Sequence, residues 1–305
     1  MNIIEVTHLK KNYGKVKAVQ DISFHVEQGE MFGFLGINGA GKSTTIHMLC
    51  TLFPPTSGSA SICGLTLGKQ DQEIRKHIGV VSQQNCLDDM LTVKENLLIR
   101  GSLYESNSQK IKHRLEELSD LLSLRDILSK RFSKLSGGQK RRCEIARALM
   151  HSPEILFLDE PTTGLDPATR KAVWKCIEAL RKDHNMTVFL TTHYMEEAAE
   201  ANHIAIIDHG NLMEYGTPFQ LKDAYVKDRL LLVPKDHNQL CLMLDNDRIP
   251  YHRLDQKIQI PVDKTMEALP ILERVQPLIH GFEVLQGTMD DVFLNVTGKV
   301  LKEEE

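Results

Sequence analysis

The chain has 305 residues, 41% hydrophobic and 26% charged, which is ordinary for a soluble globular protein of one large domain or two. Its formal net charge of −4 argues against nucleic acid as a main partner, because DNA-binding proteins are normally basic overall or in a patch. The six cysteines include no C-x-x-C pair, so their spacing fits neither a zinc site nor a disulfide framework and favours a reducing cytosol. Neither a signal peptide nor a run of ~18–20 apolar residues is visible, so we expect any membrane role to come through a partner.

A glycine-rich segment at 36–44 lies between a predicted strand at 31–35 and a predicted helix at 44–50. It fits G-x-x-x-x-G-K-[ST], the phosphate-binding loop, whose backbone N–H groups and helix N-terminus face one anion. In such a loop Lys42 reaches the β- and γ-phosphates, and the Ser43 hydroxyl holds Mg²⁺. We therefore expect nucleotide binding by Gly36, Asn38, Gly39, Ala40, Gly41, Lys42, Ser43 and Thr44.

Two residues near this segment are further candidates. Tyr13 lies in a turn between predicted strands at 3–6 and 19–26, where an exposed ring could stack on a nucleobase, although most turn tyrosines do not. Gln83 directly follows a predicted strand at 78–81. Ligands in nucleotide-binding α/β sheets sit beyond the carboxyl ends of strands, so Gln83 is placed to face a metal ion or an attacking water. A loop glutamine by itself is usually only solvated.

The pattern then changes to helix, which predicts a helical subdomain at about 88–152 inserted into the sheet domain. A capping box is expected at Thr92–Glu95. Ser136 is a good N-cap for a later helix, and the glycines at 137–138 leave N–H groups exposed at its start. This makes a second anion-binding helix terminus in one chain. The basic run at 140–142, taken alone, would usually be a solvated face.

An apolar strand at 155–160 ends in two carboxylates, which predicts a strand buried on both faces with polar groups at its tip. Asp159 is suited to hold Mg²⁺, and Glu160 can accept a proton from water that attacks the γ-phosphate. The next buried strand, at 186–190, is followed by His193. This position at a strand end, parallel to that of Glu160, distinguishes His193 from the other histidines.

These motifs together resemble the ATP-binding subunit of an ABC transporter over about residues 2–222. The resemblance rests on the phosphate loop, the signature Leu135–Gln139, the strand end Leu158–Glu160 and His193, in this order. It implies a P-loop NTPase α/β cassette with an inserted helical subdomain. It also implies that the chain binds and hydrolyses ATP with Mg²⁺.

The resemblance assigns a role to each candidate residue. It implies that Tyr13 stacks on adenine and that Gln83 senses the γ-phosphate and contacts the metal ion. Asp159 is similar to the aspartate that coordinates magnesium, and Glu160 to the general base. His193 resembles the switch histidine that contacts the γ-phosphate.

The resemblance also implies a dimer, because in this family two cassettes pack head to tail and the signature of one closes on the ATP of the other. Asp166 matches an aspartate that crosses this interface. The chain carries one phosphate loop and one signature, so we expect a second ATP-binding chain, an identical copy, and an integral membrane permease, with no nucleic acid. The expected location is cytoplasmic, peripheral on the cytoplasmic face of the cell membrane. The signature residues that would contact ATP are Ser136, Gly137, Gly138 and Gln139.

The ATP-binding domain is expected to span 1–225, and 228–305 to form a small accessory α/β domain with a sheet covered on one face. The segment 287–294 resembles the closing segment of drug-resistance-type exporter ATPases, with mild changes at 288–290. It therefore indicates export of a drug, lipid or other small molecule. The charged end at 302–305 is expected to be frayed. The predicted elements of the tail are strands at 229–233, 257–261 and 282–285 and helices at 238–244, 265–275 and 289–297.

Two other functions are alternatives. A soluble ABC ATPase of DNA repair would carry a long coiled coil between the phosphate loop and the signature, and one that acts on ribosomes usually carries two cassettes. This chain has neither sustained heptads nor a second cassette. An importer ATPase with a regulatory tail is disfavoured only by the resemblance of the closing segment to exporters.

Overall fold

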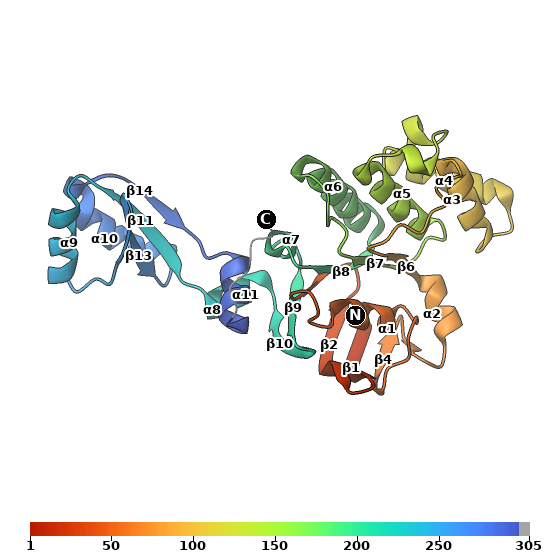
Figure 1. Ribbon diagram of the computed structural model, residues 1–305, viewed down its shortest axis with the longest axis horizontal. Helices are drawn as coiled ribbons and strands as arrows, with labels where there is room; N and C mark the ends of the chain where they lie inside the picture. Colours follow the sequence, from red (N-terminus) through yellow and green to blue (C-terminus); the bar gives the residue numbers. More distant parts are fainter. Residues whose placement is uncertain (299–305) are drawn as a thin grey trace. The chain divides into compact units, whose positions relative to one another are not determined.

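The computed structural model describes residues 1–298, which divide into a compact unit Met1–Gly216 and a second that begins at Thr217 (Figure 1). The expected domain boundary near residue 225 lies one helix later than this division. The difference arises because α8 (Pro218–Tyr225) packs against α11 (Met289–Thr297) within the second unit.

A six-stranded sheet forms the centre of the first unit, in the order β10-β9-β3-β8-β7-β6. Five strands run parallel, and β10 runs antiparallel to β9. The strands predicted at 31–35, 78–81, 155–160 and 186–190 are confirmed; β9 is additional, although its apolar run is typical of a buried strand. The six strands are β3 (Met31–Leu35), β6 (Ile78–Val81), β7 (Ile155–Asp159), β8 (Thr187–Thr192), β9 (His203–Asp208) and β10 (Asn211–Gly216).

The parallel register decides which loops meet. Leu35 pairs with Thr192, and Leu158 pairs with both Leu190 and Val81, so β3, β8, β7 and β6 end side by side. Parallel strands place their carboxyl ends at one edge of the sheet. The phosphate loop and the segments that begin after Val81, Leu158 and Thr192 therefore meet at that edge.

A second, antiparallel sheet in the order β2-β1-β4-β5 shares one hydrophobic core with the six-stranded sheet. Helix α1 (Lys42–Leu49) contacts strands of both sheets, and α2 (Asp71–His77) precedes β6. Five phenylalanine rings make neighbouring contacts in this core, with centroids 5.1 to 6.2 Å apart: Phe24, Phe32, Phe34, Phe157 and Phe189. The strands are β1 (Asn2–Tyr13), β2 (Val16–Glu27), β4 (Ser57–Ile62) and β5 (Leu65–Thr66).

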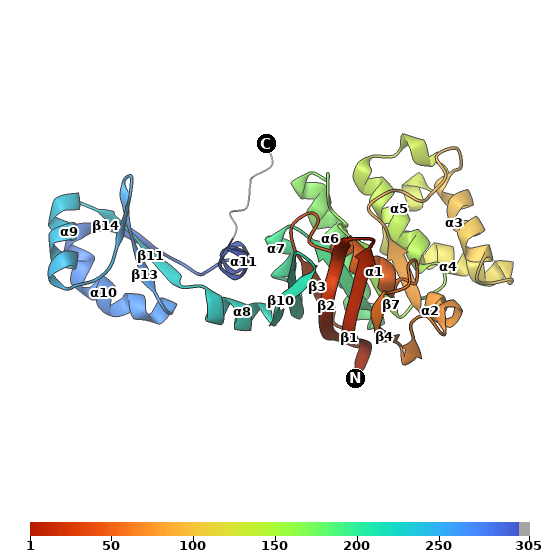
Figure 2. The ribbon, with the colours of Figure 1, turned by 60° about the horizontal axis from the view of Figure 1, so that its bottom comes forward.

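The helices α3, α4 and α5 lie side by side as one group (Figures 1 and 2). The capping box at Thr92 is confirmed, because its hydroxyl accepts from the Glu95 N–H at 3.2 Å and the Glu95 carboxylate accepts from the Thr92 N–H at 2.7 Å. Ser136 is the N-cap of α5, as predicted. The helices of this unit that follow β6 are α3 (Val93–Ser102), α4 (Ser108–Leu121), α5 (Gly137–Leu149), α6 (Pro167–His184) and α7 (Met195–Ala198), with short 3₁₀ turns at Arg125–Ile127 and Phe132–Lys134.

The second unit contains an antiparallel sheet in the order β12-β13-β11-β14. Ile258 and Ile260, at alternate positions of β13, are fully buried in one core with Leu240 and Leu244 of α9, so the prediction of a sheet covered on one face is confirmed. The elements are β11 (Asp228–Pro234), α9 (His237–Asn246), β12 (His252–Leu254), β13 (Lys257–Val262), α10 (Ala268–Val275) and β14 (Ile279–Leu285), with 3₁₀ turns at Thr265–Glu267 and Gln276–Leu278.

Within the described residues, no helix combines the length and the hydropathy needed to cross a membrane. The charged end at 302–305 lies outside the described residues.

Candidate active site

The phosphate loop joins β3 to α1, and its residue Gly41 packs closely against β2. Gly41 has a φ of 111°, in the left-handed region, and a Cβ there would lie 2.6 Å from the Ala18 carbonyl oxygen, so only glycine fits. Lys42 begins the helix with a side chain only 4% exposed. Its Nζ donates to the carbonyls of Gly36 at 2.7 Å and Ile37 at 3.2 Å, which holds the ammonium inside the curve of the loop.

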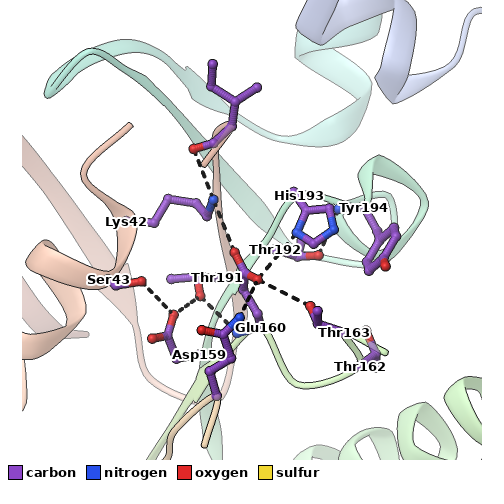
Figure 3. A network of polar contacts seen from close by, with 12 residues as sticks. Lys42, Ser43, Asp159, Glu160, Thr162, Thr163, Thr191, Thr192, His193 and Tyr194 are labelled. Carbon is purple, nitrogen blue, oxygen red and sulfur yellow. Dashed lines mark hydrogen bonds and ion pairs between the residues drawn. The ribbon is translucent and has the colours of Figure 1, made fainter. Parts of the chain in front are cut away.

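Glu160 lies opposite this lysine and joins four segments of the chain (Figure 3). Lys42 Nζ is 3.4 Å from Glu160 Oε1, and the Glu160 side chain is 9% exposed. At Glu160 Oε2, the Thr163 hydroxyl donates at 3.3 Å and the Gln83 amide at 3.5 Å, and His193 Nδ1 lies at an ion-pair distance of 3.5 Å. Gln83, Glu160 and His193, predicted as separate strand-end residues, are thus brought together.

The electrostatics keep Glu160 ionised. Contact with His193, and then the charge of Lys42, lower the pKa of the Glu160 carboxyl to about 2, against the opposite effect of burial. Burial in turn lowers the pKa of Lys42, and the Glu160 charge opposes that shift. At neutral pH the carboxylate is therefore ionised and can accept a hydrogen bond, but a pKa this low makes it a weak base.

Backbone geometry also fixes Glu160. Its φ of 45° is uncommon for a residue with a side chain, and such conformations persist where the surroundings hold them. Here the Glu160 N–H lies 3.1 Å from both the carbonyl and the hydroxyl oxygen of Thr191. The Thr191 hydroxyl donates to Asp159 Oδ1 at 2.6 Å, so one threonine orients both carboxylates.

Asp159 is 6% exposed and lies beside the phosphate loop, where Ser43 Oγ donates to its Oδ1 at 3.4 Å. A serine hydroxyl and a carboxylate at the mouth of a phosphate-binding loop are the oxygen donors that Mg²⁺ prefers. The donors present therefore fit this ion.

A cavity of about 650 Å³ opens at this edge of the sheet, a size typical of small-molecule and cofactor sites. Most of the predicted phosphate-loop residues line it, together with Gln83 and Glu160. Five other residues line it that sequence patterns do not reveal, because they come from the start of β2 and from the turn after β9. These are Val16, Lys17, Ala18, Gln20 and His209.

Several predicted residues do not line this cavity. Tyr13 is 46% exposed at the end of β1, with Lys11 Nζ 5.2 Å from the centre of its ring. Gly36 and Ala40 belong to the loop but are buried. Tyr13 would thus have to contact a ligand that extends beyond the cavity walls.

The signature, Leu135–Gln139, does not line the cavity of its own chain. Ser136 is exposed at the start of α5, where it forms a capping box with Gln139. Gly138 packs so closely on α6 that a Cβ would lie 2.1 Å from Thr169 Cγ2. Asp166 caps α6 by accepting from the Thr169 N–H at 3.0 Å, so the signature and Asp166 are neighbours.

Glu197, 4% exposed, ties two of these loops together and is another residue that the sequence patterns do not reveal. Its carboxylate accepts from the hydroxyl of Thr162, in the loop that leads to Asp166, and from that of Thr192, beside His193, at 2.7 Å. This buried carboxylate fixes both loops, because movement of either loop would leave a buried hydroxyl or carboxylate oxygen without a hydrogen-bond partner.

This arrangement defines a class of protein. A glycine loop with its lysine between a strand and a helix, and buried carboxylates at the tip of a neighbouring parallel strand, constitute the nucleotide site of a P-loop NTPase. The predicted α/β fold class is confirmed by the order of strands in the central sheet and by similarity to a solved ATP-binding cassette.

Residues 19–163 match the ABC transporter family of sequences. The daunorubicin/doxorubicin resistance ATP-binding protein DrrA of Streptomyces peucetius is 37% identical, over 97% of this chain and 92% of that protein. The Nod factor export ATP-binding protein I of Rhizobium sp. (strain N33) is 34% identical over 98% of both chains. An ATP-binding cassette solved as a dimer in a post-hydrolysis state, with ADP and phosphate bound, has a TM-score of 0.64 and 26% identity, covering 70% of this chain and 98% of that chain.

The chain belongs to the ABC transporter family and is one of its ATP-binding subunits. The resemblance seen in the sequence is thereby confirmed, as is the prediction of an ATPase.

The shifted pKa of Glu160 predicts a pH dependence of folding stability. A carboxyl whose pKa is lower in the folded chain than in the unfolded chain stabilises the fold above the unfolded pKa, and this contribution is lost as the pH falls toward the folded value of about 2. The free energy of unfolding should therefore fall more steeply for the wild type than for Glu160→Gln between about pH 5 and pH 3.

Urea titrations at several pH values would measure this difference, with Glu116→Gln, at an exposed position of α4, as the control for net charge. Parallel curves for the wild type and Glu160→Gln would show that the carboxyl has no such shift.

Proposed function

We propose that this chain is the ATPase subunit of an exporter, in which two copies close on ATP and drive a separate integral membrane permease. The observation that carries this proposal is the position of the signature. Its exposed, glycine-rich helix start is typical of an anion site, yet it lies apart from the phosphate cavity of its own chain. A second copy, placed head to tail, would bring Ser136 and Gly138 to that cavity.

The phosphate loop is proposed to bind the triphosphate, with Lys42 turning from the carbonyls of Gly36 and Ile37 toward the β- and γ-phosphates. Ser43 and Asp159 would hold Mg²⁺, with Gln83 as a further oxygen donor. When bound, this ion neutralises charge on the β- and γ-phosphate oxygens.

Glu160 is proposed to be the general base. Its carboxylate is ionised, and the turn of Lys42 toward the phosphates would weaken one of the interactions that lower its pKa. That change would favour acceptance of a proton from a water positioned against the γ-phosphate. Its hydrogen-bonding neighbours suit this role, because Thr163 and Gln83 orient Oε2 while Thr191 fixes the backbone. His193, beside the same oxygen, would contact the γ-phosphate and report its presence.

The composite site is proposed to need Ser136, Gly137, Gly138 and Gln139 of the second copy. Asp166, which caps α6 beside Gly138, would then lie at the interface between the copies. Tyr13, exposed at the end of β1, would stack on the adenine of the bound nucleotide. ATP contacts both copies only when they are closed, so binding shifts the population toward the dimer, and hydrolysis reverses the shift.

The transported substance would be a drug, lipid or other small molecule held by the permease. Support comes from the full-length relatives, whose names describe daunorubicin/doxorubicin resistance and Nod factor export. The chain would then be peripheral on the cytoplasmic face of the membrane. Its second unit would be an accessory domain.

The proposed base predicts the effect of Glu160→Gln. Loss of the proton acceptor should lower the rate of ATP hydrolysis by about 10²–10³-fold, because general bases contribute about 10²–10⁴. Phosphate release measures the rate, and retention of labelled ATP through gel filtration measures trapping in a dimer. Glu154→Gln is the matched control, at the opposite end of β7. Hydrolysis by Glu160→Gln at the normal rate would show that another group accepts the proton.

The proposed partner predicts what copurifies with the chain. A tagged chain isolated from detergent-solubilised membranes should bring down a protein with several membrane-spanning segments, and the untagged chain should not. Mass spectrometry of the eluate identifies the partner. Recovery of ribosomes or DNA instead of a membrane protein would favour the soluble ABC ATPase.

A further inference from the structure

Helix α5 carries a row of buried charges that the signature does not explain. Arg141, Glu144 and Arg147 are 6%, 0% and 7% exposed, and their spacing of three residues places them on one face of the helix. A basic run taken alone usually forms a solvated face, but Arg141 does not lie on one. Charges are seldom buried without partners, so the contacts of this row indicate what it does.

Arg141 contacts the backbone on both sides of Glu160. Its Nε donates to the Pro161 carbonyl at 2.6 Å, and its Nη2 to the Asp159 carbonyl at 3.2 Å. Its Nη1 donates to the Ser82 carbonyl at 2.6 Å, immediately before Gln83. One planar guanidinium thus joins the backbone of two separate strand ends.

Glu144 and Arg147 contact the same segment of chain on either side of Ser82 and Gln83. Glu144 Oε1 accepts from the N–H groups of Cys86 at 2.6 Å and Leu87 at 2.9 Å. Arg147 donates to Glu144 Oε2 at 2.7 Å and to the Val80 carbonyl at 2.6 Å. The segment 80–87, which carries Gln83, is therefore attached to α5 at both of its ends.

We propose that Arg141 is a positioning residue for ATP hydrolysis, which holds Gln83 and Glu160 in a fixed relation to each other and to α5. This inference rests on the proposed roles of those two residues. It makes α5 the rigid element that connects the signature at its start to the catalytic groups at the sheet edge.

The chemistry of arginine explains why this residue type is needed. Burial lowers the pKa of Arg141 to about 10, so the guanidinium stays charged at neutral pH. It presents several N–H donors in a rigid, planar fork, whereas lysine is a single point charge on a flexible stem. Lysine could satisfy only some of the three carbonyls, and methionine none.

The test compares Arg141→Met and Arg141→Lys with Arg142→Met. Arg142 is the matched control, because it lies on the same helix and donates to the carbonyls of Leu122 at 3.0 Å and Ser123 at 3.1 Å, away from the site. Three quantities are measured on the full chain: the rate constant kcat of ATP hydrolysis, the Kd for ATP, and hydrogen–deuterium exchange of the peptide covering 82–88.

Arg141→Met should lower kcat by about 10²-fold, the size of effect expected when a catalytic group is misplaced by about 1 Å. Its Kd for ATP should stay within about twofold of the wild type, because Arg141 does not line the cavity. Exchange at 82–88 should become faster. Arg141→Lys should give intermediate values for kcat and exchange, and Arg142→Met should match the wild type.

The inference would be overturned if Arg141→Met left kcat unchanged or lowered it no more than Arg142→Met does. Unchanged hydrogen–deuterium exchange at 82–88 would also overturn it. If Arg141→Met does not fold, Arg141→Lys decides by the same criteria. Failure of the proposed function would give a different result from failure of this inference. A wild-type chain without ATPase activity would contradict the roles of Gln83 and Glu160, while the exchange of 82–88 would still decide whether Arg141 holds the loop.

Discussion

The parallel pairing of β3, β8, β7 and β6 is the constraint on which the site depends. Its register sets Leu35 beside Thr192, and Asp159 beside Thr191, so the segments that follow these strands begin within reach of one another. The phosphate loop contributes backbone amides and an ammonium, and the other three segments contribute a carboxylate pair, an amide and an imidazole. A shift of one strand by a single residue would separate them, because side chains alternate between the faces of a strand.

The buried pair of Lys42 and Glu160 is the second constraint. Their side chains are 4% and 9% exposed and lie 3.4 Å apart, and burial of either charge alone would be costly. Each is therefore held by further polar contacts, through the loop carbonyls for the lysine and through Thr163 and Gln83 for the carboxylate. If a triphosphate binds Lys42 as proposed, it would exchange contacts with this network, which would link binding to movement of Gln83 and Glu160.

The catalytic candidates could be predicted from the sequence because each belongs to a local pattern, a glycine loop or a polar residue at the end of an apolar strand. The residues that the patterns miss are joined to the site only by the fold. Val16 and His209 reach the cavity from a different sheet and from a distant turn, and nothing local marks them. Arg141 is harder still, because a run of basic residues usually indicates a solvated surface, and only the packing of α5 shows it buried.

The central claim is that each chain supplies half of each ATP site, and complementation between two inactive variants tests it most directly. Lys42→Ala should prevent hydrolysis by weakening phosphate binding. Ser136→Asp keeps an N-cap for α5 but, in the proposed dimer, would place a carboxylate against the γ-phosphate of the ATP bound to the other chain. Each chain alone should be inactive, and a one-to-one mixture should recover up to about a quarter of wild-type ATPase activity, because about half of the dimers are mixed and each has one intact site. A mixture as inactive as its components, or a Ser136→Asp chain with full activity alone, would contradict the shared site.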